Sequence, residues 1–131
     1  MTIEVTSGAL ATLRAEAKQA APQECCGLLL GHDSRIDTIA AAANVSDTPE
    51  VRFEIDPLAL LSAHKAARSG GRQVLGYYHS HPTGHPLPSA TDCEHSTGDL
   101  RVWAIVARDE VAFFTDSGNG FTPLSCRIVE G

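Results

Sequence analysis

A single stretch near the middle of the chain, residues 73–92, constrains the fold more than any other. It begins with the apolar run Gln73-Val-Leu-Gly-Tyr-Tyr78, continues through His79-Ser-His81 and a loop with Pro82, Pro86 and Pro88, and ends at Ser89-Ala-Thr-Asp92. The apolar run is typical of a strand, and Ser-x-x-Asp is typical of a capped helix start. The stretch therefore predicts a strand, a loop, and a helix from Ser89 to about Thr97.

The same stretch contains three residues that suit a metal ion. Residues two apart in an extended segment point the same way, so His79 and His81 can reach one metal, with Asp92 as a third ligand. A catalytic zinc site has three such protein ligands and one open position, and zinc lowers the pKa of water to about 7. Ordinary surface or core histidines are the alternative for the His-x-His pattern, and a plain capping box is the alternative for Ser89 and Asp92. The capping box and the metal site are compatible, because a capped helix start is a rigid support for a ligand.

The remaining pattern predicts one sheet with helices on its faces, an α/β or α+β domain covering residues 1–131. The helices are expected from Ser7, as N-cap, to Pro22, and from an Asp56 cap with Pro57 in its first turn to about Ser69. The strands are expected at Ile3–Val5, Cys25–Leu30, Arg35–Val45, Arg52–Ile55, 101–108, 111–115 and 120–129, with a tight turn at Asp109-Glu110.

Composition excludes some classes of function. The net charge is −6 and the pI is about 5.4, so binding to nucleic acid or to an anionic membrane surface is not expected. The start of the chain lacks the features of a signal peptide, and no run approaches the ~20 apolar residues of a membrane span, so a cytoplasmic protein is expected. The four cysteines, Cys25, Cys26, Cys93 and Cys126, match no zinc-knuckle spacing and are predicted to be buried thiols, with a Cys93–Cys126 disulfide left open.

Together with Glu24, the set closely resembles the JAMM/MPN family of zinc metalloproteases. The family pattern is an upstream glutamate followed by His-x-His, seven residues, Ser, two residues and Asp. Here His79-Ser-His81 is followed after seven residues by Ser89 and then by Asp92, and the segment Pro22–Gly31 is similar to the family's glutamate segment. An isolated glutamate such as Glu24 would otherwise be read as an ordinary surface carboxylate.

The resemblance implies a role for each of these residues. His79, His81 and Asp92 would hold one catalytic Zn²⁺, Glu24 would carry a proton from the attacking water to the leaving amine, and Ser89 would stabilise the oxyanion. It also implies a mixed, curved sheet flanked by helices, similar to that of the cytidine deaminases. A deaminase itself would need His-x-Glu and a later Pro-Cys-x-x-Cys, and the sequence has neither.

The short segments after Val45 and near Asp109 resemble the minimal bacterial and archaeal members, which lack the insertions that grip ubiquitin. This resemblance implies a substrate of the ubiquitin-like sulfur-carrier kind that ends in Gly-Gly. The reaction would be deconjugation, C-terminal trimming, or release of cysteine from the carrier. The alternative is a non-catalytic MPN scaffold with a structural zinc. A homodimer formed through exposed sheet edges is left open.

Overall fold

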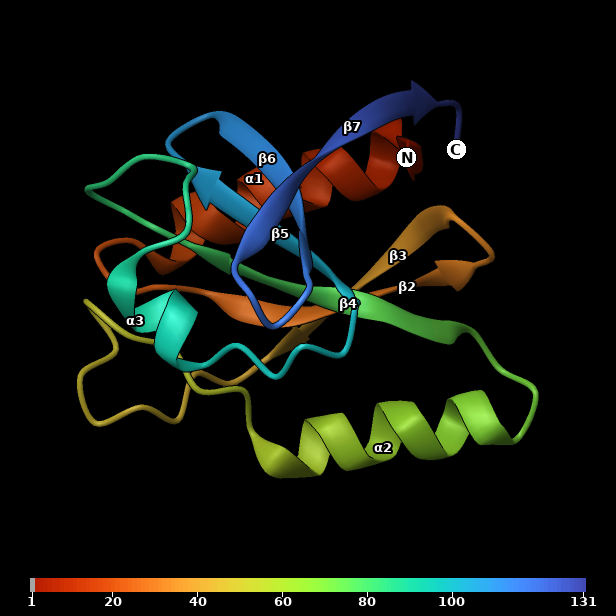
Figure 1. Cartoon of the computed structure of the whole chain (residues 1–131), viewed down its shortest axis with the longest axis horizontal. Helices are drawn as coiled ribbons and strands as arrows, with labels where there is room; N and C mark the ends of the chain where they lie inside the picture. Colours follow the sequence, from red (N-terminus) through yellow and green to blue (C-terminus); the bar gives the residue numbers. More distant parts are fainter. Residues whose placement is uncertain (1) are drawn as a thin grey trace.

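A computed structural model describes residues 2–131 of the chain (Figure 1). Within these residues, strands and helices alternate along the chain much as the sequence predicts. The elements are β1 (Thr2–Thr6), α1 (Ser7–Ala20), β2 (Cys26–His32), β3 (Arg35–Ala42), α2 (Pro57–Arg68), β4 (Gln73–Ser80), α3 (Ala90–Glu94), β5 (Val102–Ala107), β6 (Glu110–Asp116) and β7 (Phe121–Val129).

The strands form one mixed sheet that closes into a barrel in the order β1-β3-β2-β4-β5-β6-β7. β2 is antiparallel to both β3 and β4, β4 is parallel to β5, and β5, β6 and β7 are antiparallel neighbours. The ring closes where β1 pairs in parallel with β7, from Thr2 opposite Ser125 to Thr6 opposite Val129. The predicted curved, mixed sheet with flanking helices is confirmed, and its closure is an addition to the prediction.

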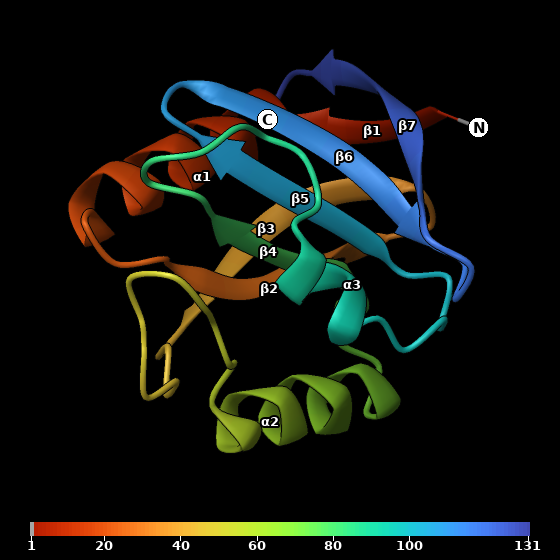
Figure 2. The ribbon, with the colours of Figure 1, turned by 60° about the vertical axis from the view of Figure 1, so that its left-hand side comes forward.

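Each face of the central strands packs against its own apolar core. In β5, Ala104 and Val106 pack with Leu13 of α1, whereas Ile105 belongs to the second core together with Phe53, because alternate residues point to opposite faces. Figure 2 shows α1 and α2 on opposite sides of the sheet. α2 covers the second core loosely, since none of its residues is buried.

The predicted start of α2 is confirmed, whereas that of α1 differs by one residue. Asp56 caps α2 by accepting a hydrogen bond from the backbone of Leu58, with Pro57 at the first helical position, as predicted. The predicted cap of α1, Ser7, is wrong. Thr6 keeps the extended conformation of β1, and its hydroxyl accepts from the backbone N–H of Ala9, so Ser7 is already inside the helix.

α3 begins at the predicted Ser89 cap but ends at Glu94, earlier than the predicted Thr97. The chain leaves the helix because Asp116 competes for its next donors. The Ser96 hydroxyl and the backbone N–H groups of Thr97 and Gly98 all donate to the Asp116 carboxylate. The loop after α3 is therefore tied to the end of β6.

The strand predicted at Arg52–Ile55 is wrong, and β3 ends at Ala42, before Val45. The segment between β3 and α2 pairs through a single bridge between Asn44 and Ile55. Phe53 and Ile55 are each 8% exposed, because they are buried in the second core while the backbone around them stays out of the sheet.

The cysteine prediction is partly wrong. All four thiols are free, so the Cys93–Cys126 disulfide is not formed. Cys25 and Cys26 are buried as predicted, but Cys93 lies on the exposed side of the short helix α3 and Cys126 lies on the outer strand β7. Among residues 2–131, no helix has the length and apolar character needed to cross a membrane.

Candidate metal centre

β4 carries two histidines to one end of the sheet and fixes their backbone on both sides. His79 lies opposite Cys26 of β2 and opposite Ile105 of β5. Just beyond the strand, the backbone N–H of His81 donates to the Val106 carbonyl at 2.8 Å. This pairing keeps residues 79–81 extended, so the side chains of His79 and His81 lie on the same side of the sheet.

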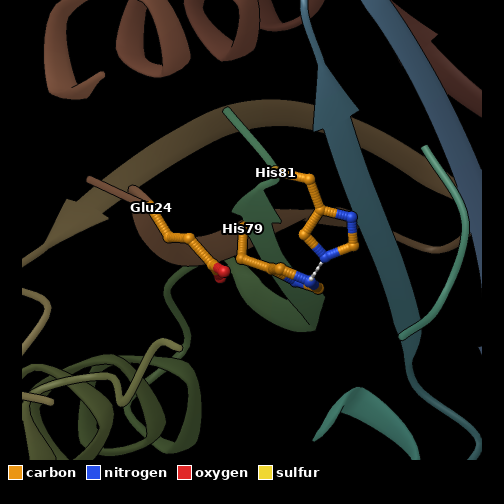
Figure 3. A group of neighbouring side chains, drawn as sticks. All are labelled: Glu24, His79 and His81. Carbon is orange, nitrogen blue, oxygen red and sulfur yellow. Dashed lines mark hydrogen bonds between the residues drawn. The ribbon is translucent and has the colours of Figure 1, made fainter. Parts of the chain in front are cut away.

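The side chains of His79, His81 and Asp92 converge on one point. The two histidine Nε2 atoms lie 3.0 Å apart, and the Asp92 carboxylate lies 3.1 Å from His79 Nε2 and 3.2 Å from His81 Nε2. His79 is fully buried and Asp92 is 2% exposed. Figure 3 shows the two imidazole rings meeting through their Nε2 atoms. The structure therefore brings together three side chains that are separated by up to 13 positions in the sequence.

Glu24 reaches this point from the segment that precedes β2. A carboxylate oxygen of Glu24 lies within 4.8 Å of a ring nitrogen of His79 and of a ring nitrogen of His81, and these two nitrogens lie within the same distance of each other. Figure 3 shows the Glu24 side chain extending toward the two rings. Burial raises the pKa of Glu24 to about 7; the nearby charge of His81 opposes this rise and that of Asp92 adds to it. A carboxyl group with a pKa near neutrality can both accept and release a proton at pH 7.

A backbone carbonyl fixes the orientation of the His81 ring. His81 Nδ1 lies 2.9 Å from the carbonyl oxygen of His85. A carbonyl can only accept, so Nδ1 carries the proton, and in the neutral ring Nε2 presents its lone pair to the centre. Metal-binding histidines are commonly held in this way. His79 Nδ1 is buried without a hydrogen-bond partner among the described residues.

The capping box at the start of α3 holds Asp92. The Asp92 carboxylate accepts from the backbone N–H of Ser89 at 2.9 Å, and the backbone N–H of Asp92 donates to Ser89 Oγ at 3.1 Å. The Ser89 hydroxyl accepts in this contact and therefore keeps its own proton free to donate. Both members of the predicted capping box thus lie beside the candidate metal centre.

The pKa values of these groups reflect a crowded and largely buried site. Burial lowers the pKa of His79. Burial also acts against the charged forms of His81 and Asp92, but hydrogen bonds outweigh it. The bond to Asp92 raises the pKa of His81, and the bonds to His79 and His81 lower the pKa of Asp92. Nitrogen and carboxylate donors of this kind are those that zinc prefers, and metal binding displaces protons from them. The donor set therefore fits a divalent metal.

An open groove of about 390 Å³ leads to the centre, and Glu24, His81 and Ser89 line it. One wall comes from the segment before α2 and the other from the loop after β4. The remaining lining residues are Glu50, Val51, Pro82, Thr83, Gly84, His85, Leu87 and Thr91. A polymer chain can enter such a groove from solvent, whereas a closed cavity would exclude it.

Three residues that contribute to this site were not assigned to it from the sequence. Phe53 and Trp103 enclose the His79 ring, with Phe53 stacked on its face and Trp103 against it edge-on. Ser80, the middle residue of the His-x-His pattern, accepts at Oγ from the backbone N–H of Cys25 at 2.8 Å, next to Glu24. The Ser80 side chain could have been assigned to the opposite face from strand alternation, but the packing of Phe53 depends on tertiary structure.

The chain is similar to known proteins in sequence and in fold. Residues 6–117 match the family described as prokaryotic homologs of the JAB domain. The chain is similar to a desampylase from Haloferax volcanii, with 38% identity over 111 residues that cover 82% of this chain and 79% of the relative. It is also similar to a probable TtuB-protein conjugate cleaving protease from Thermus thermophilus, with 36% identity over 73% of this chain and 64% of the relative.

A solved structure shares the whole fold. The solution structure of protein DSY2949 from Desulfitobacterium hafniense has a TM-score of 0.87 and 28% identity, and the match covers 100% of this chain and 94% of that one. The expected resemblance to the minimal prokaryotic JAMM/MPN proteins is therefore confirmed in sequence and in fold. The individual roles of Glu24, His79, His81, Ser89 and Asp92 remain predictions.

Proposed function

The chain belongs to the prokaryotic homologs of the JAB domain and is a hydrolase, and we propose that it is a zinc-dependent isopeptidase or amide hydrolase acting on ubiquitin-like proteins. The observation that carries the proposal is the convergence of Glu24, His79, His81 and Asp92 at one end of an open groove. Such a set combines a metal-binding face with a carboxyl group suited to proton transfer.

In this proposal His79, His81 and Asp92 hold one Zn²⁺. Zinc bound there would act as a Lewis acid that polarises a carbonyl group and lowers the pKa of water to about 7. Glu24 takes a proton from the attacking water and delivers it to the leaving amine, consistent with its raised pKa of about 7. The free Ser89 hydroxyl proton stabilises negative charge on the substrate carbonyl oxygen.

We further propose that the substrate is the C-terminal Gly-Gly of a small sulfur-carrier protein or its conjugate. The names of the two curated relatives, a desampylase and a conjugate-cleaving protease, support a substrate of this type. The groove supports it as well, because a Gly-Gly tail has no side chains to be excluded from a small groove. The bond cleaved would join this tail to a lysine, to a C-terminal extension or to cysteine.

Other features of the proposal rest on the sequence. Residues 1–131 would act as a single cytoplasmic domain that binds neither nucleic acid nor membranes, in keeping with the net charge of −6. A homodimer also remains a proposal. The closed barrel leaves little free sheet edge for strand pairing between two copies. The largest gap is at β3, which pairs with β1 only at Arg35 and Ile36.

The experiment compares zinc content and hydrolysis of a carrier-protein conjugate in the wild type and in Glu24→Gln. The variant keeps the size of the side chain and all three proposed ligands, so it should retain zinc and lose at least 100-fold in kcat, the lower part of the range of about 10²–10⁴ for general acid–base catalysis. Glu130→Gln, at an exposed site near the C-terminus, is the matched control and should behave as the wild type. Unchanged turnover in Glu24→Gln would exclude the proposed role of Glu24.

A further inference from the structure

We propose that Asn44 is a positioning residue that holds Glu24 in place by tying it to the segment between β3 and α2. The inference rests on the proposed function, because it assigns Asn44 a role through Glu24. Asn44 lies two residues after the end of β3, in a segment whose ladder pairing is limited to one bridge. The position of this segment therefore depends on side-chain hydrogen bonds more than on sheet pairing.

The Asn44 amide uses both of its ends. Its Nδ2 donates to the backbone carbonyl of Glu24 at 2.9 Å and to that of Arg52 at 3.0 Å. Its Oδ1 accepts from the backbone N–H groups of Ser46 and Glu54, each at 3.1 Å. One side chain thus joins the backbone of Glu24 to both ends of the segment from Ser46 to Glu54.

A direct backbone contact reinforces the same connection. The backbone N–H of Glu24 donates to the carbonyl of Pro49 at 2.7 Å, and Asn44 Nδ2 also lies 3.5 Å from that carbonyl. The next two residues, Glu50 and Val51, line the groove beside Glu24. Asn44 therefore sets the position of Glu24 and of one groove wall together.

The chemistry of the site requires an amide at this position. A carboxylate can accept the two N–H groups but cannot donate to the carbonyls of Glu24 and Arg52, and it would place a negative charge against both. A hydroxyl is too short to span four partners. Small displacements matter here, because a 1 Å misplacement in an active site can cost on the order of 10²-fold in rate.

The test uses Asn44→Asp and Asn44→Ser in the wild-type protein and in Glu24→Gln. Asn44→Asp keeps the shape of the side chain and removes its two N–H donors, whereas Asn44→Ser shortens the side chain without adding charge. Each should lower kcat by about 10- to 100-fold in the wild-type background. In the Glu24→Gln background each should change kcat by less than about 2-fold, since a residue that acts through Glu24 has nothing left to position. Asn119→Asp, in the exposed turn before β7, makes the same chemical change away from the site and should leave kcat unchanged.

Hydrogen exchange supplies a readout that does not depend on turnover. The backbone amide of Glu24 should exchange at least 10-fold faster in both Asn44 variants, with zinc content retained, because its bond to Pro49 depends on the tether. Equal losses of kcat in both backgrounds, or unchanged exchange at Glu24, would overturn the inference. A wild type that binds zinc but cleaves no conjugate would instead reject the proposed function, while the exchange result would still test the tether.

Discussion

The ring of Phe53 lies face to face with the ring of His79, with centroids 4.3 Å apart and planes inclined by 15°. Trp103 meets the His79 ring from another side at 5.6 Å and 88°. Phe53 comes from a segment with almost no sheet pairing, yet it is 8% exposed and belongs to the second core. The orientation of a proposed ligand is therefore set by apolar packing, since His79 Nδ1 has no hydrogen-bond partner among the described residues.

Replacing Phe53 with leucine should weaken zinc binding. The smaller side chain leaves space beside the His79 ring, and loss of a group that orients a ligand typically costs about 10- to 100-fold in metal affinity. Zinc dissociation constants from competition with a chromophoric chelator measure the effect. Phe113→Leu is the matched control, because Phe113 is also buried but packs in the core on the α1 side. Both variants should lose about 1–3 kcal/mol of unfolding free energy, and only Phe53→Leu should lose zinc affinity. Equal zinc affinities in the two variants would mean that packing does not orient His79.

Replacing Ser89 with glycine should separate the two roles of this residue. Glycine is a serviceable N-cap, with a cost of only a few tenths of a kcal/mol. The backbone N–H that holds Asp92 remains in the variant, so zinc should be retained. Loss of the hydroxyl should lower kcat by about 10²–10³-fold, as for removal of one oxyanion donor. Ser89→Thr keeps a hydroxyl and should retain most of the activity. A normal kcat in the glycine variant would mean that Ser89 caps α3 but does not stabilise the oxyanion.

The local part of the site could be predicted from the sequence. His79 and His81 follow from strand alternation, and Ser89 with Asp92 follows from the capping box, because these relationships span few residues. Glu24 could be assigned only through the family resemblance. Its neighbour Cys25 is hydrogen-bonded to Ser80, and 55 positions separate these two residues in the sequence. Local pattern carries little information about such contacts.

The errors in the predicted fold have the same origin. The segment Arg52–Ile55 has a strand-like apolar pattern, but that pattern reflects burial of Phe53 and Ile55 in the second core rather than pairing. Closure of the barrel joins β1 to β7 at opposite ends of the chain. The early end of α3 depends on Asp116, which lies 20 residues beyond Ser96. In each case a tertiary contact prevails over local preference.

Replacing Asp116 with asparagine should make stability less dependent on pH in acid. Asp116 is fully buried, and burial alone would raise its pKa. Its hydrogen bonds with Ser96, Gly118, Gly98 and Thr97 outweigh this and hold the pKa below the usual range. A lowered folded-state pKa stabilises the protein above the unfolded value of about 3.9, and this contribution is lost as the pH falls from there through the folded pKa.

The asparagine variant should therefore be less stable than the wild type at pH 7, by about 1–3 kcal/mol, because its amide cannot accept all of these bonds. The difference should shrink as the pH falls below about 4, because the wild type then loses its contribution. Urea unfolding across this range measures the effect. Asp109→Asn, in the exposed turn between β5 and β6, is the control and should follow the wild type. A stability difference that does not change with pH would contradict the argument.

Removal of zinc should abolish hydrolysis without unfolding the protein. The two apolar cores and the closed strand order do not depend on the metal centre, so the barrel should persist in a chelator with native far-UV circular dichroism and cooperative thermal unfolding. The melting temperature should fall, because a ligand that binds only the folded state stabilises it. Adding zinc back should restore both turnover and melting temperature. A His81→Ala variant should melt at the same temperature with and without added zinc. If the chelated wild type unfolds and no hydrolysis can be detected in the zinc-loaded protein, a scaffold with a structural zinc is the better description.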